Sequence, residues 1–136
     1  MSVLVDTSAW VEYFRRHDST PTDTVRSLAA TGESFLTCGP VTMEVLAGAA
    51  TPSALDTIHQ ILALGSDIPV DLKHFEEAAA LYRACRAQGV TIRSLIDCLI
   101  AVLAMAEGVE VLHHDRDFGA IARVVPLRIH PGSLAS

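Results

Sequence analysis

The sequence lacks any apolar run long enough to cross a membrane. Its longest uninterrupted apolar segment is Cys98 to Ala106, about half of the ~20 residues that a spanning helix needs. Asp6 and Glu12 interrupt the N-terminal region, which therefore does not resemble a signal peptide. Only 19% of the residues are charged and 50% are hydrophobic, a balance that excludes intrinsic disorder. We expect one soluble, cytoplasmic domain over residues 1–136.

Paired cysteines and nucleotide-binding motifs are also missing. Cys38, Cys85 and Cys98 form an odd set without C-x-x-C spacing, and each lies among apolar residues. This pattern indicates buried thiols in a reducing compartment rather than disulfides or a zinc framework. The chain contains no G-x-G-x-x-G and no G-x-x-x-x-G-K-[ST], so we expect no nucleotide cofactor.

Lysine is almost absent, since Lys73 is the only one beside nine arginines. The formal net charge of −6 argues at first against a nucleic-acid partner, because phosphate binding favours basic surfaces. Divalent cations held by clustered acids would offset part of that charge. The net charge therefore does not decide whether the partner is a nucleic acid.

Short apolar segments alternate with helical patterns along the chain. The expected strands cover residues 3–5, 34–38, 68–70, 109–112 and 124–129, the last weakened by Pro126. The expected helices cover residues 8–16, 23–30, 39–50, 52–64, 72–88 and 94–107, with a helical turn at 119–122. The strands show no alternation of apolar and polar residues, which is typical of a parallel sheet covered on both faces. The sequence therefore predicts a three-layer α/β/α sandwich with a short, mostly parallel central sheet.

Two apolar clusters have a structural interpretation. Trp10, Tyr13 and Phe14 lie close together on a short helix, which favours core or dimer packing over base stacking. Within the helix 72–88, apolar residues follow a 3.6-residue spacing that includes Leu72, Phe75 and Tyr82. This stripe predicts either a core-facing surface or a groove for a partner.

Acidic residues follow the expected strands. Asp6 ends the first strand, and Asp115 and Asp117 follow the strand 109–112. Glu44 lies one turn into the helix after the second strand, and Asp97 lies in the first turn of the most apolar helix. Because functional groups gather at the carboxyl ends of parallel strands, these distant acids can meet at one edge of the sheet.

Each acid also has a purely structural interpretation. Asp6 can cap the helix that follows it, and Asp97 ends a Ser94-x-x-Asp97 capping-box spacing. Glu44 can be a solvated side chain, and the two acids after residue 112 can form a turn. The combination of these acids at one edge points more specifically to a functional site, because acids are rarely buried without a partner.

Clustered carboxylates need a counter-charge, because each raises the pKa of the others. With one lysine in the chain, a hard divalent cation is the simplest counter-ion, and Mg²⁺ and Mn²⁺ both prefer oxygen ligands. A carboxylate pocket with open metal positions suits phosphodiester hydrolysis, in which the metal activates water and stabilises charge on the phosphate. The sequence therefore predicts a metal-dependent phosphodiesterase.

The segments that carry these acids resemble the motif series of PIN-domain ribonucleases, most closely the VapC-type toxins of bacterial toxin–antitoxin pairs. The matching segments span nearly the whole chain and are Val3-Leu-Val-Asp6-Thr-Ser8-Ala-Trp10, Pro40-Val-Thr-Met-Glu44-Val-Leu-Ala-Gly48, Asp97-Cys-Leu-Ile-Ala101 and Leu112-His-His-Asp115-Arg-Asp117-Phe118. The resemblance implies a single PIN-like domain and a metal-dependent endoribonuclease that cuts tRNA, rRNA or mRNA. It further implies a homodimer, Mg²⁺ with Mn²⁺ as a substitute, and inhibition by a cognate VapB-type antitoxin.

By this resemblance, the catalytic, metal-binding quartet is Asp6, Glu44, Asp97 and Asp115, with Glu44 acting directly or through water. The family often has Asn-x-x-Asp-Phe at the last motif, so Asp117 is a further metal candidate. Four more residues are expected to support the site or contact RNA, namely Thr7, Ser8, Arg93 and Arg116.

Other functions fit the sequence less well. A phosphoacceptor signalling domain would use an acid such as Asp71, but it also needs a second acid beside Asp6 and a late lysine. A zinc site at His113 and His114 is disfavoured because neighbouring residues on a strand point to opposite faces. Either histidine could instead contact RNA phosphate. A non-catalytic partner-binding module with a degenerate acidic pocket stays open as the main alternative.

Overall fold

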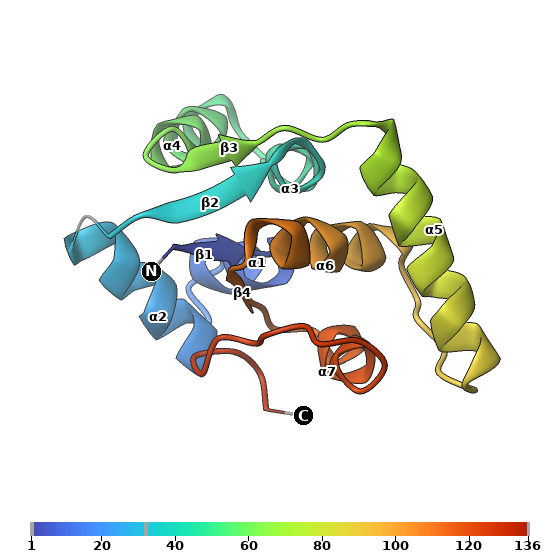
Figure 1. Ribbon diagram of the computed structural model, residues 1–136. Coiled ribbons are helices and arrows are strands. Elements are labelled where there is room, and N and C mark those ends of the chain that lie inside the picture. Colours follow the sequence, from blue (N-terminus) through green and yellow to red (C-terminus); the bar gives the residue numbers. More distant parts are fainter. Residues whose placement is uncertain (1, 32, 136) are drawn as a thin grey trace.

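The computed structural model describes residues 2–31 and 33–135. Within these ranges the strands are β1 (Val3–Val5), β2 (Phe35–Cys38), β3 (Ser66–Ile68) and β4 (Glu110–Leu112). The helices, shown with the strands in Figure 1, are α1 (Thr7–Phe14), α2 (Thr20–Thr31), α3 (Gly39–Ala47), α4 (Pro52–Leu62), α5 (Leu72–Ala87), α6 (Leu95–Glu107) and α7 (Arg116–Ala122). Gly32, the glycine that follows the expected helix 23–30, lies outside the described residues, as do both chain ends.

The four strands form one parallel sheet in the order β3-β2-β1-β4. Leu4 of β1 is paired with Leu36 on one side and with Val111 on the other. Right-handed crossovers between parallel strands place α1 to α4 on one face and α5 and α6 on the other. The contacts agree, because α1 packs on α2 and α3, whereas α5 packs on α6. The predicted three-layer α/β/α sandwich is confirmed.

Strand β1 is the point at which the strand order reverses. The chain moves outward from β1 to β2 and β3 and then crosses back to place β4 on the opposite side of β1. Loops diverge at such a reversal, and the carboxyl ends of its strands form the usual ligand crevice of open α/β sheets. Asp6 follows β1 and the loop after β4 leads to Asp115, so both acids emerge at this point.

Helix α6 forms the centre of the core and carries Asp97. All residues from 97 to 104 are buried, as expected for a helix that is apolar on nearly all sides. Ser94 caps its N-terminus by accepting a hydrogen bond from the Ile96 N–H at 3.2 Å. Gly108 ends it with a left-handed backbone conformation (φ 68°) that glycine adopts without steric strain. The site acid is therefore fixed to the most rigidly packed element.

The predicted strand at 124–129 is wrong. Only an isolated bridge forms there, between Val111 and Ile129. Pro126 has no backbone N–H and cannot donate to a sheet ladder, which accounts for the missing strand.

Several element boundaries differ from the predictions, and β3 covers Ser66–Ile68 instead of 68–70. Helix α2 begins at Thr20 instead of 23, and α7 begins at Arg116 instead of 119, because Asp115 caps it. In α5, the buried residues are Ala78, Leu81 and Cys85. Leu72 and Phe75 are exposed, so the N-terminal end of the stripe does not face the core, and the predicted alternative of a groove for a partner stays open.

The remaining core predictions hold. Trp10 is almost fully buried and packs with its ring against Phe14 and Phe35. The three cysteines are buried free thiols. Across the described ranges, no helix combines the length and the apolar character that crossing a membrane requires.

Truncating Leu103 to alanine should destabilise the fold by about 3 kcal/mol, because this fully buried side chain would leave a cavity beneath the sheet. Urea denaturation measures the difference. Leu64→Ala is the matched control, since Leu64 is exposed and its truncation should change stability by less than about 0.5 kcal/mol. Equal effects of the two substitutions would contradict the assigned core.

Candidate functional site

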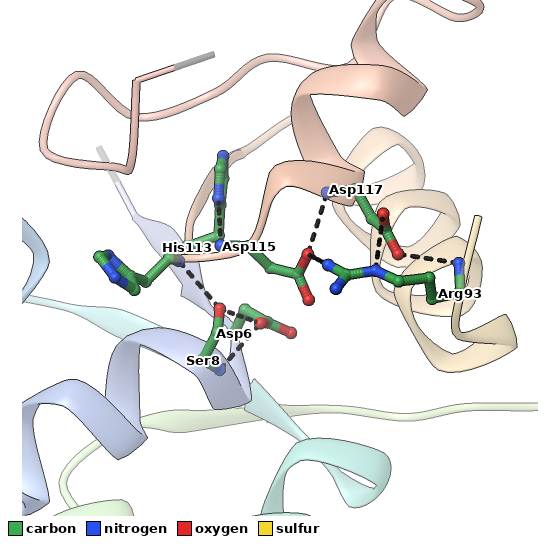
Figure 2. Close-up of polar contacts among 7 residues, drawn as sticks. Asp6, Ser8, Arg93, His113, Asp115 and Asp117 are labelled. Carbon is green, nitrogen blue, oxygen red and sulfur yellow. Dashed lines mark hydrogen bonds and ion pairs between the residues drawn. The ribbon is translucent and has the colours of Figure 1, made fainter. Parts of the chain in front are cut away.

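Asp6 lies at the junction between β1 and α1, where it is buried and also caps the helix. Its Oδ2 accepts hydrogen bonds from the Ser8 N–H at 2.9 Å and from the Ser8 hydroxyl at 2.5 Å. Ser8 Oγ in turn accepts a hydrogen bond from the backbone N–H of His114 at 2.9 Å. Ser8 therefore links the loop after β4 to Asp6, as Figure 2 shows. Asp6 can therefore cap α1 and also belong to the functional site.

Glu44 lies on the exposed side of α3, one turn after β2. Its Oε1 accepts a hydrogen bond from the Thr7 hydroxyl at 2.8 Å. Glu44 is therefore solvated, as its structural interpretation allowed, and the Thr7 hydroxyl nevertheless holds it beside the first residues of α1. Thr7 and Ser8 thus orient the two acids on this side of the site.

Asp97 is 7% exposed, and its Oδ2 has no hydrogen-bond partner among the described residues. Ser94 caps α6 through its own hydroxyl. No hydrogen bond joins the Asp97 carboxylate to the Ser94 N–H in the part of the chain that the structure describes, so the capping box does not form. A buried carboxylate oxygen without a partner is unfavourable, and a bound ion or an ordered water would satisfy it.

Asp115 and Asp117 lie at the start of α7. Asp115 caps the helix, and its Oδ1 accepts a hydrogen bond from the Asp117 N–H at 2.9 Å. Arg93, in the connection between α5 and α6, reaches both acids (Figure 2). Its Nη2 lies 2.8 Å from Asp115 Oδ1, and its Nε lies 3.4 Å from Asp117 Oδ1.

Three carboxylates from α6 and the start of α7 form a compact group. One oxygen from each of Asp97, Asp115 and Asp117 lies within 4.8 Å of the others. Asp6 and Glu44 lie outside this group, yet their charges still raise the pKa of Asp97. The structure therefore brings the whole predicted quartet to one edge of the sheet, and it places Asp117 in the same group of carboxylates as Asp97 and Asp115.

Burial raises the pKa of two of these acids. Removal from water is the main cause at Asp97, followed by the charges of Asp6, Asp115, Asp117 and Glu44, and together they raise its pKa to about 8. Burial also raises the pKa of Asp6 to about 6, although the hydrogen bonds from Ser8 oppose the change. Both shifts measure how unfavourable the ionised acids are without a counter-charge.

These features fit a divalent cation. The donors are carboxylate oxygens, which Mg²⁺ and Mn²⁺ prefer, and one of them is buried without a partner. Asp97, Asp115, Asp117 and Asp6 are the residues that would hold it, with Glu44 at the edge. A bound cation would offset the negative charges of Asp97 and Asp6 and thereby favour their ionised forms.

The histidines and arginines differ in their access to the site. His113 is buried, its pKa is lowered to about 4 mainly by that burial, and its Nδ1 accepts from the Asp115 N–H. It cannot contact RNA phosphate, whereas His114 is half-buried. Arg116 is exposed and makes no ion pair among the described residues. Asp71 lies at the start of α5 and is exposed, so the signalling interpretation gains no support.

Sequence reasoning missed two polar contacts. Glu12 Oε2 lies 2.6 Å from His17 Nδ1, and its Oε1 lies 3.5 Å from His114 Nε2, next to the loop that meets Ser8. The contacts of Arg93 with two acids were also not expected. The contacts of Glu12 with His114 and of Arg93 with the two acids join segments that are far apart in the sequence, so no spacing signals them.

The PIN-domain family model matches residues 3–124. The chain belongs to the PIN-domain family. It is 40% identical over 131 residues to Ribonuclease VapC11 of Mycobacterium tuberculosis and to the VapC ribonuclease Mb1587 of Mycobacterium bovis. The alignment covers 93% of this chain and 96% of each relative, so this PIN-domain protein matches VapC ribonucleases along almost their full length.

Solved structures share the fold at lower sequence identity. VapBC2 of Rickettsia felis, bound to a promoter DNA fragment, has a TM-score of 0.73 and 19% identity, with 96% of this chain and 98% of that one covered. The Mycobacterium tuberculosis toxin VapC20, which cleaves the sarcin-ricin loop, has a TM-score of 0.70 and 21% identity, with 93% and 98% covered. The PIN fold expected from the sequence motifs is thereby confirmed.

The metal-free chain should lose stability as pH rises from about 4 to about 8. The pKa of Asp97 is about 8 in the folded chain, against roughly 3.9 in an unfolded one. Across this interval the unfolded state has released a proton that the folded state retains, so rising pH favours unfolding. Asp6 adds to the slope only up to about pH 6. Urea denaturation in EDTA over this range measures the slope.

Asp97→Asn should flatten that slope and leave the metal-free chain at least as stable as wild type near pH 8. Asp56→Asn, which removes an exposed acid from α4, is the matched control and should keep the wild-type slope. If Asp97→Asn were less stable at every pH, the carboxylate would have a structural capping role instead.

Proposed function

We propose that the chain is a metal-dependent endoribonuclease that acts as the toxin of a type II toxin–antitoxin pair. The observation that carries this proposal is the buried Asp97 oxygen without a partner, which lies in a group of three carboxylates. The match to VapC ribonucleases along 93% of the chain supports RNA as the substrate. The neighbouring VapBC complexes support a VapB-type antitoxin as the partner.

The site residues have distinct tasks in this proposal. Asp97, Asp115 and Asp6 bind the cation, and Asp117 is a further ligand candidate because of its position in the carboxylate group. Ser8 holds Asp6 in place, and Thr7 holds Glu44 at the exposed edge. When bound, Mg²⁺ or Mn²⁺ would make water more nucleophilic and offset the charge that develops on the phosphate.

Glu44 is the exposed acid of the predicted quartet and the one whose carboxylate solvent reaches most readily. From this edge it can orient an attacking water or accept its proton, with the Thr7 hydroxyl fixing the carboxylate. Arg116, exposed at the first turn of α7, is a candidate contact for the RNA backbone. Together these groups can support hydrolysis of a phosphodiester bond.

Incubation of the purified chain with total RNA and Mg²⁺ or Mn²⁺ should give discrete products that are absent in EDTA. Loss of a group that only supports a metal ligand typically reduces affinity or activity by about 10–100-fold. Loss of a ligand itself, in Asp6→Asn or Asp97→Asn, should therefore reduce cleavage at least about 100-fold. The double variant should be little worse than either, because the carboxylates act together.

Asp56→Asn should cleave RNA like wild type and controls for the loss of an acid elsewhere on the surface. Near-wild-type cleavage by a folded Asp97→Asn variant would disprove the proposed metal site. A folded chain that binds metal but produces no cleavage from any RNA tested would favour the partner-binding module instead.

An apolar surface beside the site supports the proposed homodimer. Met43, Phe75 and Leu95 are each at least half exposed, and they line a groove of about 440 Å³ between α3, α5 and α6. Exposed apolar side chains that gather in this way usually mark an interface. We propose that a second copy of the chain covers this surface.

Phe75→Glu should convert the dimer to a monomer, because a charge would be buried without a partner in the apolar interface. Light scattering after gel filtration measures the mass. Leu64→Glu, on a different exposed surface, should leave the dimer intact. A wild-type chain that is monomeric at high concentration would contradict this part of the proposal.

A second groove suits the antitoxin. It has a volume of about 630 Å³, and its lining combines apolar residues of α1 and α4 with Arg15, Arg16 and Glu44. Because Glu44 belongs both to this groove and to the acidic site, a segment bound in the groove would lie next to the catalytic residues. We propose that an amphipathic antitoxin segment binds there and blocks access to the site.

A further inference from the structure

The exposed Arg93 contacts the carboxylate group through both its backbone and its side chain. Its backbone N–H donates to Asp117 Oδ2 at 2.9 Å, and its Nε donates to Asp117 Oδ1 at 3.4 Å. Its Nη2 donates to Asp115 Oδ1 at 2.8 Å. Both oxygens of Asp117 and one oxygen of Asp115 therefore accept hydrogen bonds from this single residue.

The same two acids belong to the three-carboxylate group with Asp97. The guanidinium pairs with Asp115 and Asp117 and offsets one of their two charges. It makes no hydrogen bond to Asp97, whose buried Oδ2 is left without a partner. A cation that binds Asp97 together with Asp115 or Asp117 would lie beside this guanidinium and, at Asp117, would share carboxylate oxygens with Arg93. Arg93 and a divalent cation are therefore alternative counter-charges for overlapping ligands.

Because its side chain is exposed, the Arg93 guanidinium is easier to displace from the carboxylates than a bound divalent cation. The Arg93 side chain is 61% exposed, and exposed ion pairs are weak because water screens them and the side chain loses freedom on pairing. The backbone hydrogen bond to Asp117 does not depend on the guanidinium. The side chain can therefore leave while the loop between α5 and α6 stays attached to α7.

We propose that Arg93 is a built-in counter-cation for Asp115 and Asp117, which a divalent cation displaces when it binds. This inference rests on the proposed metal-dependent function and adds a regulatory element to the same site. Once displaced, the guanidinium is free to bind an RNA phosphate, a ligand that its planar fork of donors suits. RNA that binds Arg93 would in turn favour metal binding, since coupling between two ligands is reciprocal.

The first test is titration of the metal-free chain with Mn²⁺ alone, followed by electron paramagnetic resonance of the unbound ion. Arg93→Gln should bind Mn²⁺ about two- to fivefold more tightly than wild type, the range expected for loss of an exposed ion pair. Arg116→Gln is the matched control, because it removes the same charge beside the same acids without breaking an ion pair in the described structure. Its affinity should change less. Circular dichroism checks that each variant is folded.

The second test observes the guanidinium directly. The Nε–H resonance of Arg93, identified by its absence in Arg93→Gln, should shift as Mg²⁺ is added to wild type and should saturate together with metal binding. A resonance that stays unchanged while Mg²⁺ saturates the site would overturn the inference and leave the metal site intact. So would Mn²⁺ affinity in Arg93→Gln that is equal to or weaker than that of wild type. Failure of every variant to bind metal would disprove the metal site itself, and the inference with it.

Discussion

Burial of carboxylates close to one another dominates the chemistry of this chain. Asp6 and Asp97 are both buried, and their pKa values are raised to about 6 and about 8 by loss of solvent and by neighbouring acids. In the described structure, Arg93 compensates only Asp115 and Asp117. The remaining charge needs a cation, a proton or a positively charged partner. This requirement gives the proposed metal a physical cause in the chain's own acids.

The fold places these charges together and prevents them from separating. Parallel pairing of β1 with β4 brings the segments after both strands to the same edge of the sheet. Helix α6 cannot withdraw Asp97, because its residues from 97 to 104 are buried in the core. Ser8 connects the two loops through hydrogen bonds to Asp6 and from His114. A rigid arrangement of this kind keeps the site ready for a cation before one binds.

The sequence predicted the layers, most elements and the edge at which the acids meet, because apolar periodicity and helix caps are local signals. Asp6 and Asp97 were identifiable from their positions after a strand and within an apolar helix. The strand predicted at 124–129 does not form, because Pro126 weakens its pairing. How far it does so depends on the fit to the neighbouring strand, which the local sequence does not show. The contacts of Arg93 and the burial of His113 arise from loops that meet in space. The position of Asp117 beside Asp97 likewise depends on where α7 begins.

Diffraction from crystals of the chain grown with Mn²⁺, recorded for the anomalous signal of manganese, tests the central claim most directly. The account predicts a manganese peak that contacts Asp97 Oδ2 and at least one carboxylate of Asp115, Asp117 or Asp6. The same map should place the Arg93 guanidinium away from Asp115. A well-ordered site without manganese, in which Arg93 still bridges Asp115 and Asp117 and Asp97 is bonded to protein groups alone, would contradict the account.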